Sequence, residues 1–542
     1  MSLKLEKFKD FKGRSGPLLF IIMDGVGIGK QDETDGVFSA KTPCLDQLFK
    51  SNLFTTLQAH GTAVGLPSDD DMGNSEVGHN ALGAGRVFAQ GAKLVDASIK
   101  TGEIFKTPIW EKLTKNPAED NGTIHFIGLF SDGNVHSHIS QLFALIKQCA
   151  KQSVKKFRLH ILLDGRDVGE KTALIYIKQA EELFKAINDE FGLDFQIASG
   201  GGRMITTMDR YNADWSVVKR GWNTHVLGKA RAFKSASEAV QTYYDEDPKI
   251  TDQYLESFVI EKDGNPIGTI NDGDSVVFFN FRGDRAIELS RAFDEKYFNE
   301  FDRERYPNVI FAGMMEYDGD LKIPKNYLVN PPKIDQTIGE YLCDEGVKSF
   351  ALSETQKYGH VTYFWNGNKS GYINEQMEKY IEIPSDKIRF EEAPKMKVYE
   401  ITEKAIELLK SGEYKFGRIN FPNGDMVGHT GVVDAIKVSV EALDECVCRL
   451  IETVSSLGGI TVVSADHGNA DEMFTEKNGK RIVKTAHTLN PVPFIIVDPL
   501  NEGEYKMADL DKRGLSNVAA TLFNLLGFEK PKGYDPSLIL FE

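Results

Sequence analysis

Short apolar runs alternate with longer amphipathic stretches along the 542 residues of the chain. The apolar runs are predicted to be buried strands: Leu18–Met23, Ile124–Phe130, Leu159–Leu163, Phe195–Ala198, Val276–Phe281, Arg418–Phe421, Ile460–Ser464 and Phe494–Val497. Three of the stretches between them have clear helical spacing: Ile139–Gln152, Lys171–Phe191 and Val432–Leu457. Strands that alternate with helices predict an α/β fold with largely parallel sheets.

Two segments rich in turn-forming residues interrupt this alternation. Gly83–Gly91 is rich in glycine, and Tyr317–Pro332 contains Asp-Gly-Asp, Ile-Pro-Lys and Asn-Pro-Pro. The predicted strands outside these segments end in Asp and His, whereas those between them often end near Arg. We therefore expect one α/β domain, residues 1–88 and 331–542, interrupted by a second α/β domain at residues 89–330.

Charge and composition narrow the range of partners. The net charge of −16 argues against binding to nucleic acid or to an anionic membrane surface. The N-terminal segment lacks an apolar signal core, and the longest strongly apolar run, Leu18–Met23, is far shorter than the ~20 residues of a membrane span. Five cysteines without zinc-site or redox-motif spacing indicate a reducing compartment. A cytoplasmic protein is expected.

Acidic and imidazole side chains gather beside the predicted strand ends of the outer domain. They are Asp24, Asp425, His429, Asp466, His467 and His487. Loops that follow the carboxyl ends of parallel strands share one edge of a sheet, so these side chains can converge there. A single Asp in such a place is more often a turn former or a helix cap. Together, however, carboxylates and imidazoles suit two adjacent ions such as Mn²⁺ or Zn²⁺.

A glycine-rich segment, Asp69–Arg86, places Ser75 at the expected start of a helix. The N-terminus of a helix offers unpaired N–H groups and a positive dipole, which suit a phosphate group. No nearby Ser-His-Asp pattern and no Gly-x-Ser-x-Gly motif would activate this hydroxyl, so metal coordination is the expected activator. The alternative is that Ser75 only caps the helix.

Five arginines follow successive predicted strands of the inserted domain. They are Arg166, Arg203, Arg210, Arg282 and Arg285. Guanidinium groups bind phosphate and carboxylate through paired hydrogen bonds. In a chain of net negative charge, this set indicates a small substrate with two anionic groups. The alternative for each arginine alone is a surface or salt-bridged position.

Four motifs resemble those of the cofactor-independent phosphoglycerate mutases, a family related to the alkaline phosphatases. They are Gly73–His79, Asp164–Asp167, Asp425–Gly431 and Ala465–Asn469, and the resemblance extends over essentially the whole chain. Phe364–Asn368 is similar to the plant and trypanosomatid members. The resemblance implies an alkaline-phosphatase-like α/β sandwich interrupted by an α/β transferase domain. It also implies an isomerase that interconverts 3-phosphoglycerate and 2-phosphoglycerate in glycolysis and gluconeogenesis, through a phosphoserine and without bisphosphoglycerate.

The resemblance assigns roles residue by residue. One divalent ion would be held by Asp425, His429 and His487, and the other by Asp24, Ser75, Asp466 and His467. The implied substrate-binding residues are His136, Arg166, Asp167, Arg203, Arg210, Arg282, Arg285 and Lys357. Ser75 would be the nucleophile, Lys357 would neutralise developing charge and Asp167 would act as a base. Mn²⁺ is the expected metal, with Mg²⁺ or Co²⁺ as alternatives, and a monomer is expected.

Two rival functions fit the same residues less well. A metal-dependent phosphohydrolase, or another phosphomutase of the same superfamily, would use a similar metal set and serine. The arginines of the inserted domain and Lys357 favour phosphoglycerate over other substrates. A non-catalytic phosphoglycerate-binding protein would have no use for the intact metal set and Ser75.

Overall fold

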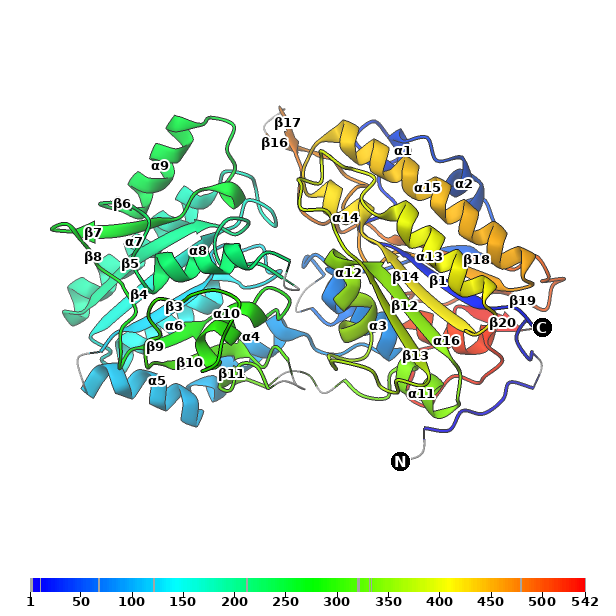
Figure 1. The fold of residues 1–542 in the computed structure, drawn as a ribbon, viewed down its shortest axis with the longest axis horizontal. Helices are drawn as coiled ribbons and strands as arrows, with labels where there is room; N and C mark the ends of the chain where they lie inside the picture. The colour runs from blue at the N-terminus through cyan, green and yellow to red at the C-terminus, as the bar shows by residue number, and fades with distance from the viewer. Residues whose placement is uncertain are drawn as a thin grey trace. The chain divides into compact units, whose positions relative to one another are not determined.

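The computed structural model describes residues 3–9, 11–66, 69–119, 122–210, 213–318, 322–330, 332, 334–477 and 480–541. Within the second predicted linker, the Asp-Gly-Asp turn and the first proline of Asn-Pro-Pro lie partly outside these ranges, as does part of the N-terminal segment. The chain forms two compact units, one made of Met1–Gln90 and Lys333–Glu542 and the other of Gly91–Pro332 (Figure 1). Among the helices of the described ranges, none has the length and apolarity needed to span a membrane.

The first unit is built on a seven-stranded sheet. Its strands, in spatial order, are β13 (Glu378–Ile383), β12 (Ser349–Glu354), β14 (Phe416–Phe421), β1 (Leu18–Met23), β15 (Ile460–Ser464), β18 (Val492–Val497) and β2 (Phe54–Leu57). The five strands from β13 to β15 are parallel, whereas β18 is antiparallel to both of its neighbours. The start of β18 therefore lies beside the end of β15, with Phe494 opposite Ser464.

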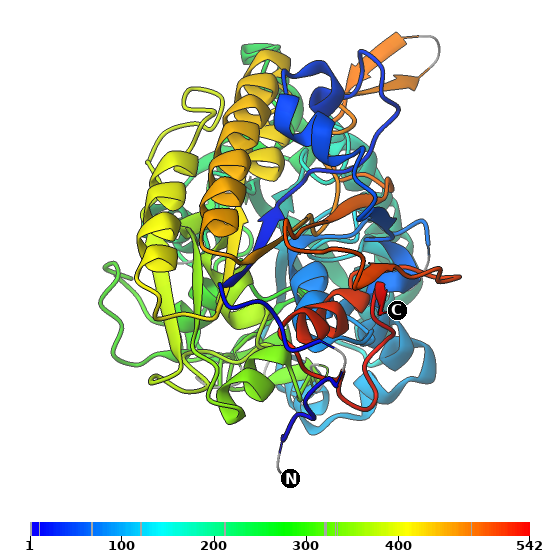
Figure 2. The same ribbon diagram turned by 90° about the vertical axis from the view of Figure 1, so that its right-hand side faces the viewer.

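Helices cover both faces of this sheet, which explains why β1 is a continuous apolar run with every residue buried. The helices are α1 (Gly36–Ser39), α2 (Pro43–Leu48), α3 (Ser75–Ala84), α11 (Ile338–Asp344), α12 (Thr355–Gly359), α13 (Val398–Lys410), α14 (Asn423–Gly428), α15 (Val433–Ser456) and α16 (Asn517–Leu525). Shorter helical turns are η1 (Gly61–Val64) and η4 (His360–Phe364). Figure 2 shows α13 and α15 side by side, and α16 packs against α3.

Two small two-stranded sheets complete the first unit. Strand β16 (Phe474–Lys477) pairs with β17 (Lys480–Val483), and β19 (Tyr505–Met507) pairs with β20 (Ile539–Phe541). Both pairs are antiparallel. Neither contributes a strand to the seven-stranded sheet.

The second unit is built on a nine-stranded sheet. Its strands are β11 (Tyr327–Val329), β10 (Ile310–Met315), β9 (Ser275–Phe278), β3 (Ile124–Leu129), β4 (Lys156–Leu163), β5 (Asp194–Gly202), β7 (Phe258–Lys262) and β6 (Arg231–Phe233), with β8 (Asn265–Pro266) paired to β7. The strands from β11 to β5 are parallel, and β7 is antiparallel to β5. The carboxyl ends of β9, β3, β4 and β5 thus lie next to one another.

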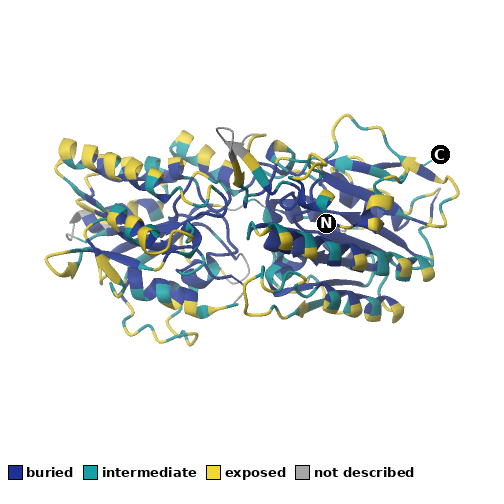
Figure 3. Cartoon of the chain, turned by 90° about the horizontal axis from the view of Figure 1, so that it is seen from above, coloured by how far each residue is buried: buried dark blue, intermediate teal, exposed yellow. Residues whose placement is uncertain are grey.

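Helices also surround the second sheet. They are α4 (Gly91–Thr101), α5 (Pro108–Glu119), α6 (Ile139–Lys151), α7 (Ala173–Phe191), α8 (Trp215–His225), α9 (Ala236–Glu246) and α10 (Ile287–Asp294), with short turns η2 (Glu103–Lys106) and η3 (Asp252–Tyr254). In each unit the central strands of the sheet are buried and the helices expose their outer faces (Figure 3). The predicted α/β class is confirmed, and the three predicted helices correspond to α6, α7 and α15.

The first predicted linker begins too early. Gly83 was expected to open it, but helix α3 continues to Ala84, and Gly83 is buried. A Cβ atom on Gly83 would lie 2.0 Å from the carbonyl oxygen of Trp365. This glycine therefore permits close packing of α3, and the break in the chain comes after it, at Gly85, where φ is +63°.

Candidate active site

The loops at one edge of the first sheet bring the predicted metal ligands together. Asp24 follows β1 directly, and Asp466 follows β15. Asp425 lies in α14, the short helix after β14. His487 comes before β18, yet it reaches the same edge because β18 is antiparallel. The predicted convergence of strand ends therefore includes the start of one antiparallel strand.

A glycine turn ties three of these loops to one another. Gly25 has a φ of +75°, and a Cβ atom on it would lie 2.4 Å from the backbone nitrogen of Asp425. Asp425 N–H donates to the carbonyl of Asp24 at 2.9 Å. The carbonyl of Gly25 accepts hydrogen bonds from Asn469 N–H and Ala470 N–H, both at 2.9 Å. The loops after β1, β14 and β15 are thereby held in fixed register.

Two imidazoles converge on one carboxylate. Asp425 Oδ1 lies 2.8 Å from His429 Nε2 and 3.1 Å from His487 Nε2. The other nitrogens, the Nδ1 atoms, bond to the carbonyls of Thr485 at 2.5 Å and Gly73 at 2.7 Å. Because a carbonyl only accepts, each Nδ1 is the donor, and a neutral ring then has its lone pair on Nε2. Imidazoles oriented in this way are typical metal ligands.

A second set of possible ligands lies beside the first. Ligand atoms of Asp24, Asp466 and His467 lie within 4.8 Å of one another, and so do those of Asp425, His467 and His487. His467 Nε2 is 3.4 Å from Asp24 Oδ1 and 4.0 Å from Asp425 Oδ1. These two groups of three share His467, which the family resemblance assigns to one ion only. Their carboxylates and imidazoles fit two neighbouring divalent ions.

Ser75 is the first residue of α3 and faces this cluster. Its Oγ lies 3.0 Å from His467 Nε2 and 3.3 Å from Asp24 Oδ1, and it accepts a hydrogen bond of 2.5 Å from Lys357 Nζ. The side chain of Asn74, not that of Ser75, caps the helix by accepting from two backbone N–H groups. The alternative that Ser75 serves only as a cap is therefore wrong.

Among the residues that the structure describes, no serine-protease-like relay accompanies Ser75. His467 Nε2 contacts the serine, but His467 Nδ1 bonds to the carbonyl of Gly468 at 3.2 Å rather than to a carboxylate. A histidine that acts as a general base needs a carboxylate at that nitrogen to stabilise its charged form. The geometry therefore supports the interpretation that a bound metal activates the hydroxyl.

A buried lysine balances the negative charge of the cluster. Lys357, from α12 after β12, is 1% exposed. Its Nζ lies 2.7 Å from both Asp24 Oδ1 and Asp425 Oδ2. Burial would raise the pKa of Asp425, but Lys357 and His429 outweigh it and hold that pKa well below its usual range.

The pKa values of Asp24 and Asp466 are shifted in opposite directions. Burial raises the pKa of Asp24 to about 7, the charge of Asp466 adds to the rise, and Lys357 opposes it. Burial also acts to raise the pKa of Asp466, but His467 and His79 reverse its effect and lower that pKa. In the absence of metal, Asp24 is thus the carboxylate of this cluster that takes up a proton near neutral pH.

His79 belongs to the site although the sequence reasoning did not assign it a role. Its Nδ1 lies 2.8 Å from the carbonyl of Ser75 and 3.3 Å from Asp466 Oδ2. Its Nε2 accepts from Asn420 Nδ2 at 3.2 Å, and the same amide donates to Asp24 Oδ2 at 2.8 Å. His79 follows Ser75 by four residues, so the two share one face of a helix. This spacing of four residues could have indicated, from the sequence, that His79 lies beside Ser75.

The second unit gathers the predicted substrate-binding residues at the carboxyl edge of its own sheet. Loops after four neighbouring strands carry them: His136 after β3, Arg166 and Asp167 after β4, Arg203 and Arg210 after β5, and Arg282 and Arg285 after β9. All seven side chains are buried. The backbone carbonyl of His136 accepts from Phe281 N–H at 2.8 Å, which joins two of these loops.

Carboxylates hold some of these guanidinium groups. Arg203 Nη1 lies 2.8 Å from Asp164 Oδ1 and also contacts Asp167. Arg282 Nε and Arg210 Nη1 lie 3.2 and 3.5 Å from the two oxygens of Asp284. The sequence reasoning missed the roles of Asp164 and Asp284, although both lie within motifs that it had singled out.

Positive charge remains in excess in this cluster. Five guanidinium groups face three carboxylates, those of Asp164, Asp167 and Asp284. Burial lowers the pKa of Arg285, and the charges of Arg210, Arg166 and Arg203 lower it further. Burial and the surrounding arginines likewise lower the pKa of His136, which is therefore neutral. Buried, mutually repelling guanidinium groups indicate a site for an anion.

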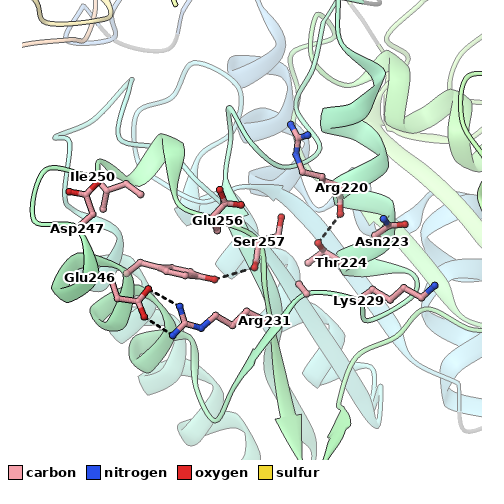
Figure 4. Close-up of a pocket in the computed structure, with 12 residues that line it drawn as sticks. Arg220, Asn223, Thr224, Lys229, Arg231, Glu246, Asp247, Ile250, Glu256 and Ser257 are labelled. Carbon is pink, nitrogen blue, oxygen red and sulfur yellow. Dashed lines mark hydrogen bonds and ion pairs between the residues drawn. The ribbon is translucent and has the colours of Figure 1, made fainter.

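A separate hollow of about 520 Å³ in the second unit has a different character (Figure 4). It lies beside α8 and α9, and its lining mixes basic with acidic side chains. Arg231 spans part of it and donates two hydrogen bonds of 2.7 Å to Glu246. None of the predicted site residues is among its described lining residues. The predicted site residues therefore lie at the two sheet edges rather than around this hollow.

Comparison with known proteins agrees with this geometry. A family model described as the metalloenzyme superfamily matches residues 16–530, and this places the chain in that class. A probable 2,3-bisphosphoglycerate-independent phosphoglycerate mutase of Leptospira interrogans is 54% identical over 99% of both chains. The mutase of the same name from Trypanosoma brucei brucei is 52% identical over 99% of this chain and 100% of that one.

A plant protein and a solved structure extend the match. The mutase of the same name from Ricinus communis is 49% identical over 97% of both chains. A crystal structure of Leishmania mexicana phosphoglycerate mutase at low cobalt concentration is 51% identical, has a TM-score of 0.97 and covers 99% of this chain and 100% of that one. The chain belongs to the family of 2,3-bisphosphoglycerate-independent phosphoglycerate mutases. The resemblance inferred from the motifs, including the trypanosomatid and plant members, is confirmed.

Proposed function

We propose that this chain is an isomerase that interconverts 3-phosphoglycerate and 2-phosphoglycerate, with Ser75 as the transient carrier of the phosphoryl group. Its family membership supports the reaction. The single observation that carries the assignment of Ser75 is its position. Its Oγ is the hydroxyl that faces Asp24, His467 and Lys357 at 3.3 Å or less.

The metal ligands proposed for one ion are Asp425, His429 and His487, and those for the other are Asp24, Ser75, Asp466 and His467. When bound, two divalent ions would act as Lewis acids that favour the ionised serine and neutralise charge on the phosphoryl oxygens. Mn²⁺ is the proposed metal, since mixed carboxylate and imidazole ligands suit it, with Mg²⁺ or Co²⁺ as alternatives.

The protein side chains account for the steps of the transfer. Ser75 Oγ releases its proton and forms a bond to phosphorus while the bond from phosphorus to the substrate oxygen breaks, and that oxygen takes up one proton to leave as a hydroxyl of glycerate. Lys357 Nζ, 2.5 Å from Ser75 Oγ, is placed to neutralise charge that develops there. In the return step, the other hydroxyl of glycerate attacks the phosphoserine, and Asp167 is the proposed base that takes up its proton. The bond from phosphorus to Ser75 Oγ breaks, and the serine oxygen takes up a proton to restore the free hydroxyl.

The buried arginines of the second unit are the proposed binding groups for the substrate. Guanidinium groups match both the carboxylate of glycerate and a phosphate. His136 is neutral, so it can accept or donate a hydrogen bond without adding charge. Retention of glycerate by these groups, with exclusion of water, would distinguish a mutase from a phosphohydrolase.

One assay separates these functions. The purified chain is supplied with 3-phosphoglycerate and Mn²⁺ and without bisphosphoglycerate, and 2-phosphoglycerate and free phosphate are both followed. We expect 2-phosphoglycerate without free phosphate, and loss of both activity and acid-stable phosphoenzyme in Ser75→Ala. Release of free phosphate alone would identify a phosphohydrolase, and full activity of Ser75→Ala would move the nucleophile elsewhere.

A further inference from the structure

A continuous chain of hydrogen bonds crosses the interior of the second unit, outside the residues discussed so far. Its members, in order, are Asp274, His125, His160, Ser199, His225 and Thr207. The five links measure 3.2, 2.9, 2.6, 2.7 and 3.0 Å. Every member is at most 5% exposed. Buried polar groups cost free energy of folding unless each one is hydrogen-bonded. A linked series of this length therefore needs a physical explanation.

The carboxylate at one end fixes the direction of every link. Asp274 accepts backbone hydrogen bonds from Thr123 and Asn271, both at 2.7 Å, and its pKa is low because these bonds and His125 outweigh burial. Because the Asp274 carboxylate only accepts hydrogen bonds, His125 Nε2 must be the donor. In a neutral ring, His125 Nδ1 then accepts from His160 Nε2.

The remaining hydrogen bonds, from His160 to Thr207, run in the same direction. His160 Nδ1 must accept from the Ser199 hydroxyl, which accepts from His225 Nδ1. His225 Nε2 therefore accepts from the hydroxyl of Thr207. Burial lowers the pKa of all three histidines, that of His225 to about 3, so the neutral rings that this pattern needs are the stable ones. Each donor has one acceptor, and all five links point toward Asp274.

The hydrogen-bond chain ends at Thr207, whose backbone conformation is strained. Thr207 has a φ of +74°, and this left-handed conformation is unfavourable for a β-branched side chain. Its backbone N–H donates to the carbonyl of Val217 at 2.9 Å, and its hydroxyl donates to His225. These contacts from α8 hold the conformation in place.

Thr207 lies in the segment that joins two arginines of the anion site. Arg203 precedes it and Arg210 follows it. The carbonyl of the next residue, Met208, accepts a hydrogen bond of 2.5 Å from Arg285 Nη1. The turn at Thr207 therefore determines where that carbonyl points, and with it the position of a third arginine.

We propose that the hydrogen-bond chain from Asp274 to Thr207 is a positioning device for the anion site. It holds Thr207 in its left-handed conformation, so that the Met208 carbonyl orients Arg285 and the segment presents Arg210. Thr207, His225 and Ser199 are positioning residues that act through these arginines. The identity of the anion as phosphoglycerate rests on the proposed function.

The test uses variants that differ by one hydroxyl. Thr207→Val removes the donor to His225, and Thr207→Ser keeps it. We expect Thr207→Val to raise KM for 3-phosphoglycerate about tenfold or more, because a displaced Arg285 loses a hydrogen bond to the charged substrate, with a smaller change in kcat. Thr207→Ser should stay within about twofold of wild type, because its hydroxyl preserves the link.

A second break, remote from the arginine segment, makes the test specific. Ser199→Ala interrupts the chain at its middle and should raise KM in the same direction. Thr224→Val is the matched control: Thr224 is a buried threonine of α8 whose hydroxyl bonds to the carbonyl of Arg220 at 2.7 Å, outside the chain. It should leave KM unchanged. Unchanged KM in both Thr207→Val and Ser199→Ala, at full folding, would overturn the proposal.

Two further measurements keep the outcome clear. If Thr207→Val does not fold, Thr207→Ala, which also lacks the hydroxyl but has no branched side chain, should show the same rise in KM. Calorimetric titration with 3-phosphoglycerate and with inorganic phosphate measures binding without turnover. If wild type binds these anions but does not isomerise, the proposed function fails, while weaker binding by Thr207→Val would still support the positioning role. Equal binding by the two proteins would count against it.

Discussion

The Nε2 atoms of His429 and His487 lie 3.0 Å apart. Each ring donates its Nδ1 proton to a backbone carbonyl, so in the neutral rings two lone pairs face each other across Asp425 Oδ1. Two lone pairs at this distance repel unless a cation lies between them or one ring takes up a proton. This arrangement therefore favours a bound metal ion and disfavours the neutral, metal-free state.

Replacement of one of these imidazoles should remove metal. We expect wild type to retain two divalent ions per chain after dialysis, and His487→Ala to retain no more than one, since a lost ligand weakens binding at a shared site. Metal content is measured by elemental analysis. His60→Ala is the control, because His60 Nδ1 bonds to the carbonyl of Asp69 at 3.0 Å. Two ions retained by His487→Ala would show that His487 is not a ligand.

The pKa of Asp24 predicts how the metal-free protein responds to pH. That pKa is raised from 3.8 to about 7 in the folded chain, so between these values the folded state binds more protons than the unfolded state. The free energy of unfolding must then fall as pH rises from about 4 to 7, by at most about 4 kcal/mol from this group. Asp24→Asn lacks this contribution.

The quantity to measure is the difference in free energy of unfolding between wild type and Asp24→Asn. Chemical denaturation in the presence of a chelator, at several pH values, gives the free energy of unfolding of wild type and of Asp24→Asn. The stability of wild type relative to the variant should decrease from pH 4 to pH 7. This comparison cancels the opposite contributions of Asp425 and Asp466, whose pKa values are lowered. A constant difference would show that Asp24 is already ionised throughout this range.

Lys357 should matter more for turnover than for binding. Its Nζ contacts Ser75 Oγ at 2.5 Å and two ligand carboxylates at 2.7 Å, so its charge is centred where the transfer begins. We expect Lys357→Met to lower kcat by about 10² to 10³, as for the loss of one electrostatic contact in a transition state. Steady-state kinetics at saturating metal measures this. Lys348→Met, at a surface lysine paired with Glu413, should have no effect; equal kcat values for Lys357→Met and wild type would refute the role.

The sequence predicted the positions of the strands well because buried parallel strands are continuous apolar runs. Leu18–Met23 and Ile460–Ser464 coincide with β1 and β15. The orientation of β18 was not predictable from periodicity, which is the same for parallel and antiparallel strands. As a result, the sequence pattern grouped His487 with the strand ends, but only the antiparallel pairing of β18 with β15 explains why a residue before a strand lies at the same edge.

Residues that act through other residues were harder to find. His125 and His160 lie inside apolar strands, where a lone histidine looks like any buried polar residue. Their partners Ser199 and His225 are separated from them by tens of residues. The pairing of β3, β4 and β5 brings the two histidines beside Ser199, and the packing of α8 against β5 adds His225. A local pattern holds no information on such a contact, so the arginines could be predicted from the sequence but the hydrogen-bond chain that supports their loop could not.

The arginines of the second unit should control affinity for substrate. Arg282 is buried, and its Nε lies 3.2 Å from Asp284 Oδ1 within the cluster of excess positive charge. We expect Arg282→Ala to raise KM for 3-phosphoglycerate by about 10- to 100-fold, as for the loss of hydrogen bonds to an anion, with a smaller fall in kcat. Arg231→Ala is the control, because Arg231 pairs with Glu246 at the separate hollow of the same unit (Figure 4). Initial rates over a range of substrate concentrations separate the two constants. An unchanged KM in Arg282→Ala, beside an unchanged Arg231→Ala, would mean that the anion binds without this guanidinium group.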